Sequence, residues 1–172
     1  MNQVDILAIF AHPDDAELTV GGTMLKMKHL GYRTGALDVT AGEMGTRGTQ
    51  EGRAIEAAEA ARILKLDLRE NLGLPDGHVF VTDFERTALV RALRRLKPKV
   101  ILTHQIGDSH PDHDHIAQLV RESARLASMR RYDEEIYVYR CDMHSNDFCN
   151  KIISTGFIRY ANTWYVDVAS LY

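Results

Sequence analysis

The stretch that decides the fold is residues 6–17, which reads ILAIFAHPDDAE. Its first five residues are all apolar, and a short unbroken apolar run of this kind is typical of a strand buried on both faces. The run leads into His12, Asp14 and Asp15. One imidazole and two adjacent carboxylates at a strand end place metal-binding and proton-transfer groups where open α/β sheets hold their ligands. The stretch therefore predicts a buried strand that leads directly into a functional site.

Length and composition limit the kind of protein that can carry this site. The chain has 172 residues, of which 45% are hydrophobic and 26% are charged, and this favours one globular domain over residues 1–172. A formal net charge of −3 gives no electrostatic footprint for nucleic acid, and the apolar run at 6–11 is too short to cross a membrane. The first residues lack the basic region of a secretory signal, and Cys141 and Cys149 form no Cys-x-x-Cys pair. We therefore expect a cytoplasmic protein with reduced cysteines and no nucleic-acid or membrane partner.

The order of the predicted elements indicates the fold class. Strand-like runs alternate with longer segments of helical period, which is typical of βαβ units and a mostly parallel sheet. We expect an α/β protein with helices on both faces of that sheet. The predicted strands cover residues 4–10, 34–40, 100–103, 135–140 and 163–168, and the predicted helices cover 18–30, 51–66, 83–97 and 112–127. Residues 41–49 contain three glycines and predict a loop, residues 72–77 predict a turn, and residues 146–160 show no clear period.

A second polar cluster, HPDH at residues 110–113, also follows a predicted strand and begins a helix. Right-handed crossovers place the ends of parallel strands at one edge of the sheet, so the two clusters can meet there. If His12, Asp15 and His113 converge, two imidazoles and one carboxylate leave an open coordination position. That pattern is typical of a catalytic Zn²⁺ site, although Fe²⁺ or another divalent ion can occupy such ligands.

The remaining polar residues suggest proton-transfer roles around such a metal. A water in the open position becomes nucleophilic near neutral pH, and Asp14 could accept its proton as general base. His110 could protonate a leaving group or hold a developing oxyanion, with Asp112 as its carboxylate partner. From the residues alone, simpler interpretations remain open, because Asp112 equally suits a helix N-terminus and Asp14 or Asp15 could be an N-cap.

The motifs resemble those of a known family. The AHPDDAE segment at 11–17, the GEMGTRGT loop at 42–49 and the HPDH segment at 110–113 resemble the LmbE-like (PIG-L) N-acetylglucosaminyl deacetylases. The match is closest to the bacterial branch that deacetylates GlcNAc-malate in bacillithiol synthesis. The resemblance implies a Rossmann-like fold and Zn²⁺ held by His12, Asp15 and His113. It also implies hydrolysis of the N-acetyl group of a small amino-sugar substrate to give acetate and a free amine.

The same resemblance assigns further roles. It makes Asp14 the general base and His110 the general acid or oxyanion partner, with Asp112 beside it. Arg53 matches a substrate-contacting arginine, and Arg47 in the glycine-rich loop is a second candidate, for which a solvated loop arginine is at least as well favoured. Members of this branch often form hexamers, so a homo-oligomer is expected.

Two departures from the family pattern leave alternatives open. Ser109 stands where relatives often have arginine, and the chain ends at Tyr172 whereas relatives usually run further. The apparently short C-terminus leads us to consider a non-catalytic metal-binding module beside the deacetylase. Cleavage of the amide of a thiol conjugate, as in a related branch, is the nearby enzymatic alternative.

Other interpretations are less favoured. A dinucleotide-binding domain would carry a phosphate cradle at the first turn, where the charges of Asp14 and Asp15 would repel a pyrophosphate. His115 lies two residues after His113 and faces differently on a helix, so we expect it not to be a ligand. The remaining histidines have no partner motif and are interpreted as surface or core residues, with His104 the most notable because it ends a strand at the same edge; they are His29, His78, His104 and His144.

Overall fold

The computed structural model describes residues 3–129, 136–141, 158–160 and 163–165. Its centre is a five-stranded sheet in the order β3-β2-β1-β4-β5, and every pairing in this sheet is parallel. The strands are β1 (Ile6–Phe10), β2 (Thr34–Asp38), β3 (Leu68–Asn71), β4 (Val100–His104) and β5 (Tyr137–Cys141). A separate antiparallel pair joins β6 (Ile158–Tyr160) to β7 (Thr163–Tyr165). The predicted α/β class with a mostly parallel sheet is confirmed.

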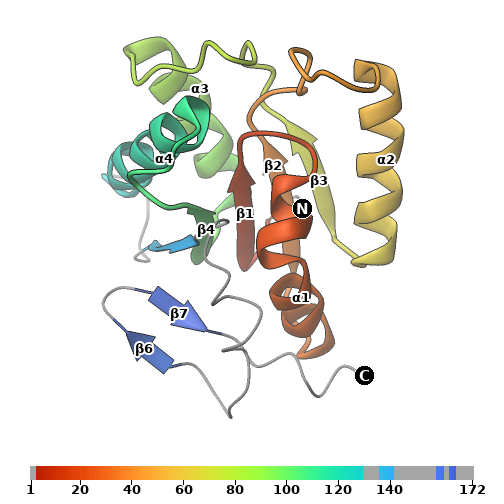
Figure 1. The fold of residues 1–172 in the computed structure, drawn as a ribbon. Coiled ribbons are helices and arrows are strands. Elements are labelled where there is room, and N and C mark those ends of the chain that lie inside the picture. The colour runs from red at the N-terminus through yellow and green to blue at the C-terminus, as the bar shows by residue number, and fades with distance from the viewer. Residues whose placement is uncertain (1–2, 130–135, 142–157, 161–162, 166–172) are drawn as a thin grey trace.

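Helices cover both faces of the sheet, as the sequence predicts (Figure 1). They are α1 (Asp15–His29), α2 (Gln50–Ile63), α3 (Asp83–Leu96) and α4 (Pro111–Ser128). Successive residues of β1 point to opposite faces, so Leu7 and Ile9 join one apolar core with α3 and α4, while Ala8 and Phe10 join a second core with α1. Every residue of β1 is buried, which explains its uninterrupted apolar sequence.

The ends of several helices follow from local sequence. A capping box starts α3, because the Thr82 side chain accepts from the backbone of the first turn while Glu85 reaches back to the Thr82 amide. Gly31 takes the positive φ expected just after α1. The start of α1 was predicted too late, since the helix begins at Asp15 and not at Leu18. This difference matters because it puts Asp15 in the first turn of a helix.

The structure also corrects one strand prediction and confirms only part of another. No strand was predicted for residues 68–71, which form β3, because its sequence Leu-Arg-Glu-Asn has only one apolar residue. β6 lies within the segment for which the sequence showed no clear period. The predicted strand at 163–168 is confirmed as far as Tyr165, and its last three residues lie outside the described part of the chain, as do Cys149 and His144. Among the described residues, no helix is long and apolar enough to span a membrane.

A buried ion-pair network connects β2, β3 and α1 beside the core. The Arg69 guanidinium donates to both carboxylate oxygens of Asp38, at 2.9 and 3.0 Å, and also to Glu17 and to the Ala57 carbonyl of α2. Burial raises the pKa of Asp38 to about 6, although Arg69 opposes that shift. The network therefore depends on Arg69 to keep a carboxylate charged inside the protein.

We expect Arg69→Met to lower the free energy of unfolding by about 3 kcal/mol at pH 7.5, because it leaves the Asp38 charge buried without a partner. A raised folded-state pKa means that Asp38 contributes stability below its unfolded pKa and loses it as the pH rises through about 6. The difference between variant and wild type should therefore shrink at pH 4, where Asp38 is protonated. Urea unfolding at both pH values measures this difference.

Arg95→Met is the control for this prediction. Arg95 pairs with Glu70 at the surface, where its side chain is 46% exposed, so its loss should cost less than about 1 kcal/mol. An Arg69→Met variant that is no less stable than Arg95→Met at pH 7.5 would contradict the role assigned to the buried network.

Candidate metal centre

Two strand ends meet at the point where the order of the sheet reverses. β1 is followed in sequence by β2 on one side, and β4 pairs with β1 on the other, so the crevice between the ends of β1 and β4 is the topological switch point. His12 lies in the loop after β1, and His110 and His113 lie at the start of α4, which follows β4. The fold thus brings the HPDD and HPDH motifs to one place.

The Asp15 carboxylate lies at the centre of this cluster. Its Oδ2 atom lies 3.2 Å from His12 Nδ1, 3.5 Å from His113 Nε2 and 3.4 Å from His104 Nε2, and it accepts the backbone amide of His12 at 2.9 Å. Burial by itself would raise the pKa of Asp15, but the imidazoles of His104, His113 and His12 hold it well below its ordinary value. Asp15 is therefore a buried anion surrounded by ring nitrogens.

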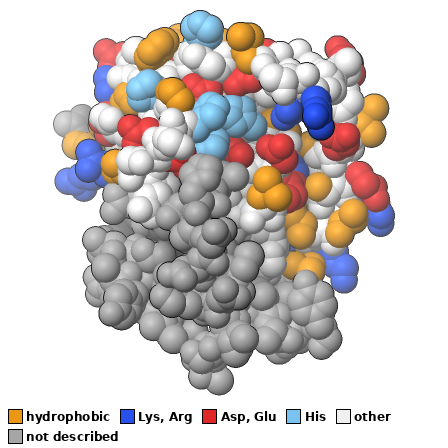
Figure 2. All heavy atoms as spheres, in the orientation of Figure 1, with side chains coloured by type: hydrophobic (Ala, Val, Ile, Leu, Met, Phe, Trp, Pro, Cys, Tyr) orange, Lys and Arg blue, Asp and Glu red, His pale blue; other side chains and the backbone are white. Residues whose placement is uncertain are grey.

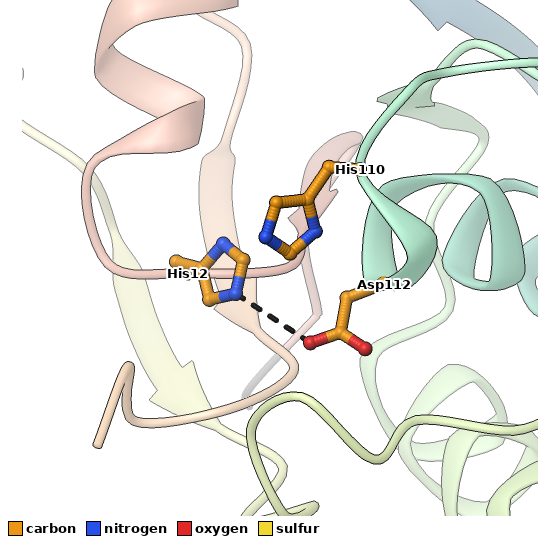
Figure 3. Close-up of side chains that lie close together, drawn as sticks. All are labelled: His12, His110 and Asp112. Carbon is orange, nitrogen blue, oxygen red and sulfur yellow. Dashed lines mark ion pairs between the residues drawn. The ribbon is translucent and has the colours of Figure 1, made fainter. Parts of the chain in front are cut away.

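His12 is held between carboxylates. Its Nε2 atom lies 2.9 Å from Asp76 Oδ1 and 3.7 Å from Asp112 Oδ2, as Figure 3 shows for Asp112. Burial lowers the pKa of His12, but Asp15 and Asp76 outweigh that effect and raise it to about 9. In the absence of a cation, the cluster therefore favours a proton on His12, and a metal ion would replace that positive charge.

His110 and Asp112 come from the start of α4 (Figure 3). The His110 ring stacks on His113 with centroids 4.5 Å apart and meets His12 edge-on at 5.1 Å. Burial, followed by the charges of His113 and His12, lowers the pKa of His110. The Asp112 carboxylate accepts the backbone amides of Gly77 and Val79 at 2.7 and 3.4 Å. These contacts tie Asp112 to the loop before α3, in addition to placing it near His12.

Asp14 and Arg53 lie at the solvent side of the cluster. The Asp14 side chain is 55% exposed, and its Oδ2 atom lies 4.0 Å from Arg53 Nη1. Partial burial and then the neighbouring Asp15 charge raise the pKa of Asp14. Arg47 is exposed in the loop between β2 and α2. The structure thus brings Arg53 to the cluster. Among the described residues, Arg47 makes no contact with the cluster.

Three residues of this region were missed or given no role by sequence reasoning. His104 ends β4, accepts the Ala11 amide at 3.0 Å and stacks on His113 with ring centroids 3.9 Å apart. Asp76 sits in the turn at 72–77, and Asp108 precedes the HPDH motif. An acidic residue in a turn is common, so Asp76 and Asp108 carry no signal by themselves, whereas the strand-end position of His104 did provide one.

The donor atoms fit a divalent cation. Among the described residues, three groups place their donor atoms within 4.8 Å of one another, and each combines two imidazoles with one carboxylate. One of them is the predicted set of His12, Asp15 and His113. The group containing His104 uses a fully buried ring, and in the group containing Asp112 both carboxylate oxygens accept backbone amides. In the group of His12, Asp15 and His113, both imidazoles face the same oxygen of Asp15. This group is therefore the best candidate. Its surroundings are visible in Figure 2, where histidine side chains form a surface patch bordered by acidic side chains.

Two glycines of the loop at 42–49 make room for the Arg53 guanidinium. A Cβ atom at Gly45 would lie 2.6 Å from Arg53 Nη2, and one at Gly42 would lie 2.8 Å from Nη1. Gly42 also has a φ of +67°, which other residues rarely adopt. The loop backbone therefore fixes where the guanidinium lies relative to Asp14.

Since the sequence makes Arg53 a candidate substrate contact, we expect Gly45→Ala to displace its guanidinium and to raise the KM of the expected deacetylase about tenfold, a magnitude that corresponds to the loss of about one charged hydrogen bond. Metal content should not change, because Gly45 contacts none of the candidate ligands in the described structure. Steady-state kinetics and metal analysis of the variant measure both quantities, and Gly21→Ala in α1 is the control, because its backbone is helical and an added Cβ would meet Leu64 at an ordinary 3.8 Å. A metal-depleted Gly45→Ala variant would contradict this assignment.

Comparison with known proteins finds relatives that are named as deacetylases. It is 27% identical over 177 residues to diacetylchitobiose deacetylase from Thermococcus kodakarensis, covering 96% of this chain and 64% of that protein. It is 29% identical over 135 residues to the probable N-acetyl-alpha-D-glucosaminyl L-malate deacetylase 2 of Bacillus anthracis, covering 71% of this chain and 60% of that protein. The crystal structure of the conserved protein TT1542 from Thermus thermophilus superposes with a TM-score of 0.77 at 41% identity, covering 81% of this chain and 67% of that one.

The chain thus spans about 60% of the length of these two curated relatives. The family model PIG-L, described as GlcNAc-PI de-N-acetylase, matches residues 7–124. That range begins in β1 and ends in α4, so it contains the HPDD motif, the glycine-rich loop and the HPDH motif together. The chain belongs to the PIG-L family.

Proposed function

We propose that this chain is a zinc-dependent hydrolase that removes the N-acetyl group from a GlcNAc-type substrate, releasing acetate and a free amine. The observation that carries the proposal is the convergence of His12, Asp15 and His113 within 4.8 Å in a chain of the PIG-L family. The names of the relatives, which specify diacetylchitobiose and GlcNAc-malate, support an N-acetylated amino-sugar as substrate class.

The proposed metal ligands are His12, Asp15 and His113. A bound Zn²⁺ would supply a Lewis acid that lowers the pKa of a water molecule and polarises the amide carbonyl. Asp15 would contribute its negative charge, which the low pKa preserves at any ordinary pH. The two imidazoles would contribute neutral donors once the cation takes the place of the proton on His12.

Asp14 is proposed to accept the proton of the attacking water. It lies between the proposed ligands His12 and Asp15 in the sequence, so it stands beside the metal-binding group while its side chain remains half exposed. Arg53, 4.0 Å from Asp14, is proposed to hold a substrate hydroxyl or carboxylate at the same edge.

His110 is proposed to protonate the departing amine or to hold the oxyanion that develops on the carbonyl. Its ring is near both His12 and His113, and its backbone amide is fixed by Asp108 Oδ1 at 2.8 Å. Asp112 is proposed to support His110 from the first turn of α4. In this scheme the hydroxyl of the attacking water is added to the carbonyl carbon, which leaves as acetic acid. The proton that Asp14 accepts from the water is balanced by the proton that His110 gives to the departing amine.

Release of acetate and amine from defined substrates tests this function. Zinc-loaded protein should convert GlcNAc, GlcNAc-malate or N,N'-diacetylchitobiose with acetate and amine formed in equal amounts, and treatment with a chelator should abolish the reaction until Zn²⁺ is restored. Fe²⁺-loaded protein should be assayed in parallel, since such ligands accept iron as well. The relative rates would identify the aglycone and test the narrower assignment to bacillithiol synthesis.

Two outcomes would redirect the assignment. Release of an amine from a thiol conjugate, without reaction of the GlcNAc substrates, would favour an amidase. Stoichiometric metal binding without acetate release from any substrate would overturn the hydrolase and favour a metal-binding module.

A further inference from the structure

The two candidate imidazole ligands present opposite ring nitrogens to Asp15. His12 places Nδ1 at 3.2 Å from Asp15 Oδ2, whereas His113 places Nε2 at 3.5 Å from the same atom. A neutral imidazole binds a metal through whichever nitrogen lacks a proton, so the site works only if each ring is held in the correct orientation and tautomer. The side chains that contact the nitrogens turned away from Asp15, His12 Nε2 and His113 Nδ1, therefore decide which nitrogen of each ring can bind a metal.

Asp76 holds the far nitrogen of His12. Its Oδ1 atom lies 2.9 Å from His12 Nε2, while its Oδ2 atom accepts the Met44 amide at 2.8 Å. The Asp76 backbone amide donates to Glu43 Oε1 at 2.8 Å, and the whole residue is buried. The carboxylate is thus fixed from the loop after β2, and the oxygen that remains points at His12.

Asp108 lies beside the far nitrogen of His113, in an ion-pair contact and not in a hydrogen bond like that of Asp76. Its Oδ2 atom lies 3.3 Å from His113 Nδ1, and its Oδ1 atom accepts the His110 amide at 2.8 Å. Only 3% of the Asp108 side chain is exposed. A residue that precedes the HPDH motif therefore connects the start of α4 to the ring of His113.

We infer that Asp76 and Asp108 are positioning residues that fix His12 as an Nδ1 ligand and His113 as an Nε2 ligand of the metal. This inference rests on the proposed metal site. An ionised carboxylate only accepts hydrogen bonds, so each one favours a proton on the far nitrogen and leaves the lone pair of the near nitrogen directed at the metal. The carboxylates also increase the basicity of the rings they contact.

Asp112 is the competing candidate for His12, and its contacts make it the weaker one. It lies 3.7 Å from His12 Nε2, compared with 2.9 Å for Asp76. Both of its oxygens accept backbone amides, from Gly77 and Val79. Asp76 also lies closer to its imidazole than Asp108 does, at 2.9 Å compared with 3.3 Å, so its removal should weaken metal binding more.

Zinc affinity, measured by competition with a chromophoric chelator, tests the inference without substrate. Asp76→Ala should weaken Zn²⁺ binding about 10- to 100-fold, and Asp108→Ala should weaken it by a smaller factor. Asp114→Asn is the control, because Asp114 lies next to His113 in the first turn of α4 but accepts the Gly107 amide and not a candidate ligand ring. Asp76→Asn keeps the volume but has one acceptor oxygen for two donors, the His12 ring and the Met44 amide, so it carries the test if Asp76→Ala does not fold.

Nitrogen NMR of zinc-loaded protein with ¹⁵N-labelled histidine shows which ring nitrogen carries a proton and which binds the metal. A residue with a merely structural role would not change this assignment. The wild type should show His12 protonated at Nε2 and metal-bound at Nδ1, and His113 with the opposite assignment. The Asp76 variants should lose the protected His12 Nε2 proton, and Asp114→Asn should keep it.

Wild-type affinity in folded Asp76 variants, or metal bound at Nε2 of His12, would overturn the inference. These measurements use no acetylated substrate. A protein that gives the expected affinities and spectra but releases no acetate would overturn the proposed hydrolase while leaving the positioning roles intact.

Discussion

Asp14→Asn is expected to lower kcat about 100- to 10,000-fold, the contribution typical of a positioned general base, while the protein keeps its metal. The amide of asparagine has nearly the volume of the carboxylate but accepts no proton from water. Asp14 lies beside the candidate ligands without being one of them, so metal content should equal that of the wild type. Acetate release at saturating substrate and metal analysis of the same sample measure both effects.

Asp83→Asn is the control for this substitution. The Asp83 side chain is 98% exposed at the start of α3, so removal of its charge should leave kcat unchanged. If Asp14→Asn keeps wild-type turnover with its metal bound, another residue must accept the proton. If it loses its metal, Asp14 is a ligand and the division of roles between Asp14 and Asp15 is wrong.

The parts of the fold that the sequence predicts are those with a strong local pattern. β1 is a continuous apolar run because both of its faces are buried, and α3 begins with a capping box that is legible in Thr82 and Glu85. β3 has neither signal. Its Arg69 serves a buried ion pair and not an apolar core, so no pattern of hydrophobic residues marks the strand.

The residues of the candidate site also differ in whether a local sequence pattern marks them. His12, Asp15, His110 and His113 are visible in sequence because two motifs of unusual composition each follow a strand. Asp108 precedes His113 by only five residues, but an aspartate in a loop is too common to mark this contact in sequence. Asp76 lies 64 residues from His12, and only the folded arrangement of the sheet brings the two side chains together. Local sequence cannot identify a residue such as Asp76, whose role depends on contact with a residue far away in the chain.

Asp15 shows how the fold gives a residue more than its motif suggests. The sequence pairs it with His12 and His113, but the structure adds His104, whose ring is completely buried at the end of β4. Because three imidazoles face this one carboxylate, the charge of Asp15 would be the nearest negative charge to a cation held by the proposed ligands. The consequence is that Asp15 should be the least replaceable residue of the cluster.

Asp15→Ala is therefore expected to weaken Zn²⁺ binding more than about 100-fold, beyond the effect of losing a residue that only supports a ligand. The variant loses a donor oxygen and also the negative charge that offsets the cation. Metal content after dialysis against a weak chelator should fall to background, and acetate release should fall with it. His113→Ala should have the same effect through loss of one imidazole.

His115→Ala is the matched control for both ligand variants. It removes an imidazole from the same helix two residues after His113, but its Nδ1 atom contacts the Val79 carbonyl at 2.7 Å, away from Asp15. It should bind zinc like the wild type. If Asp15→Ala retains stoichiometric metal, the ion is held by one of the two other groups, which are built on His104 or on His110 and Asp112. A loss of metal in His115→Ala would instead place the ligands on the other face of α4, and the assignment of His12, Asp15 and His113 would fail.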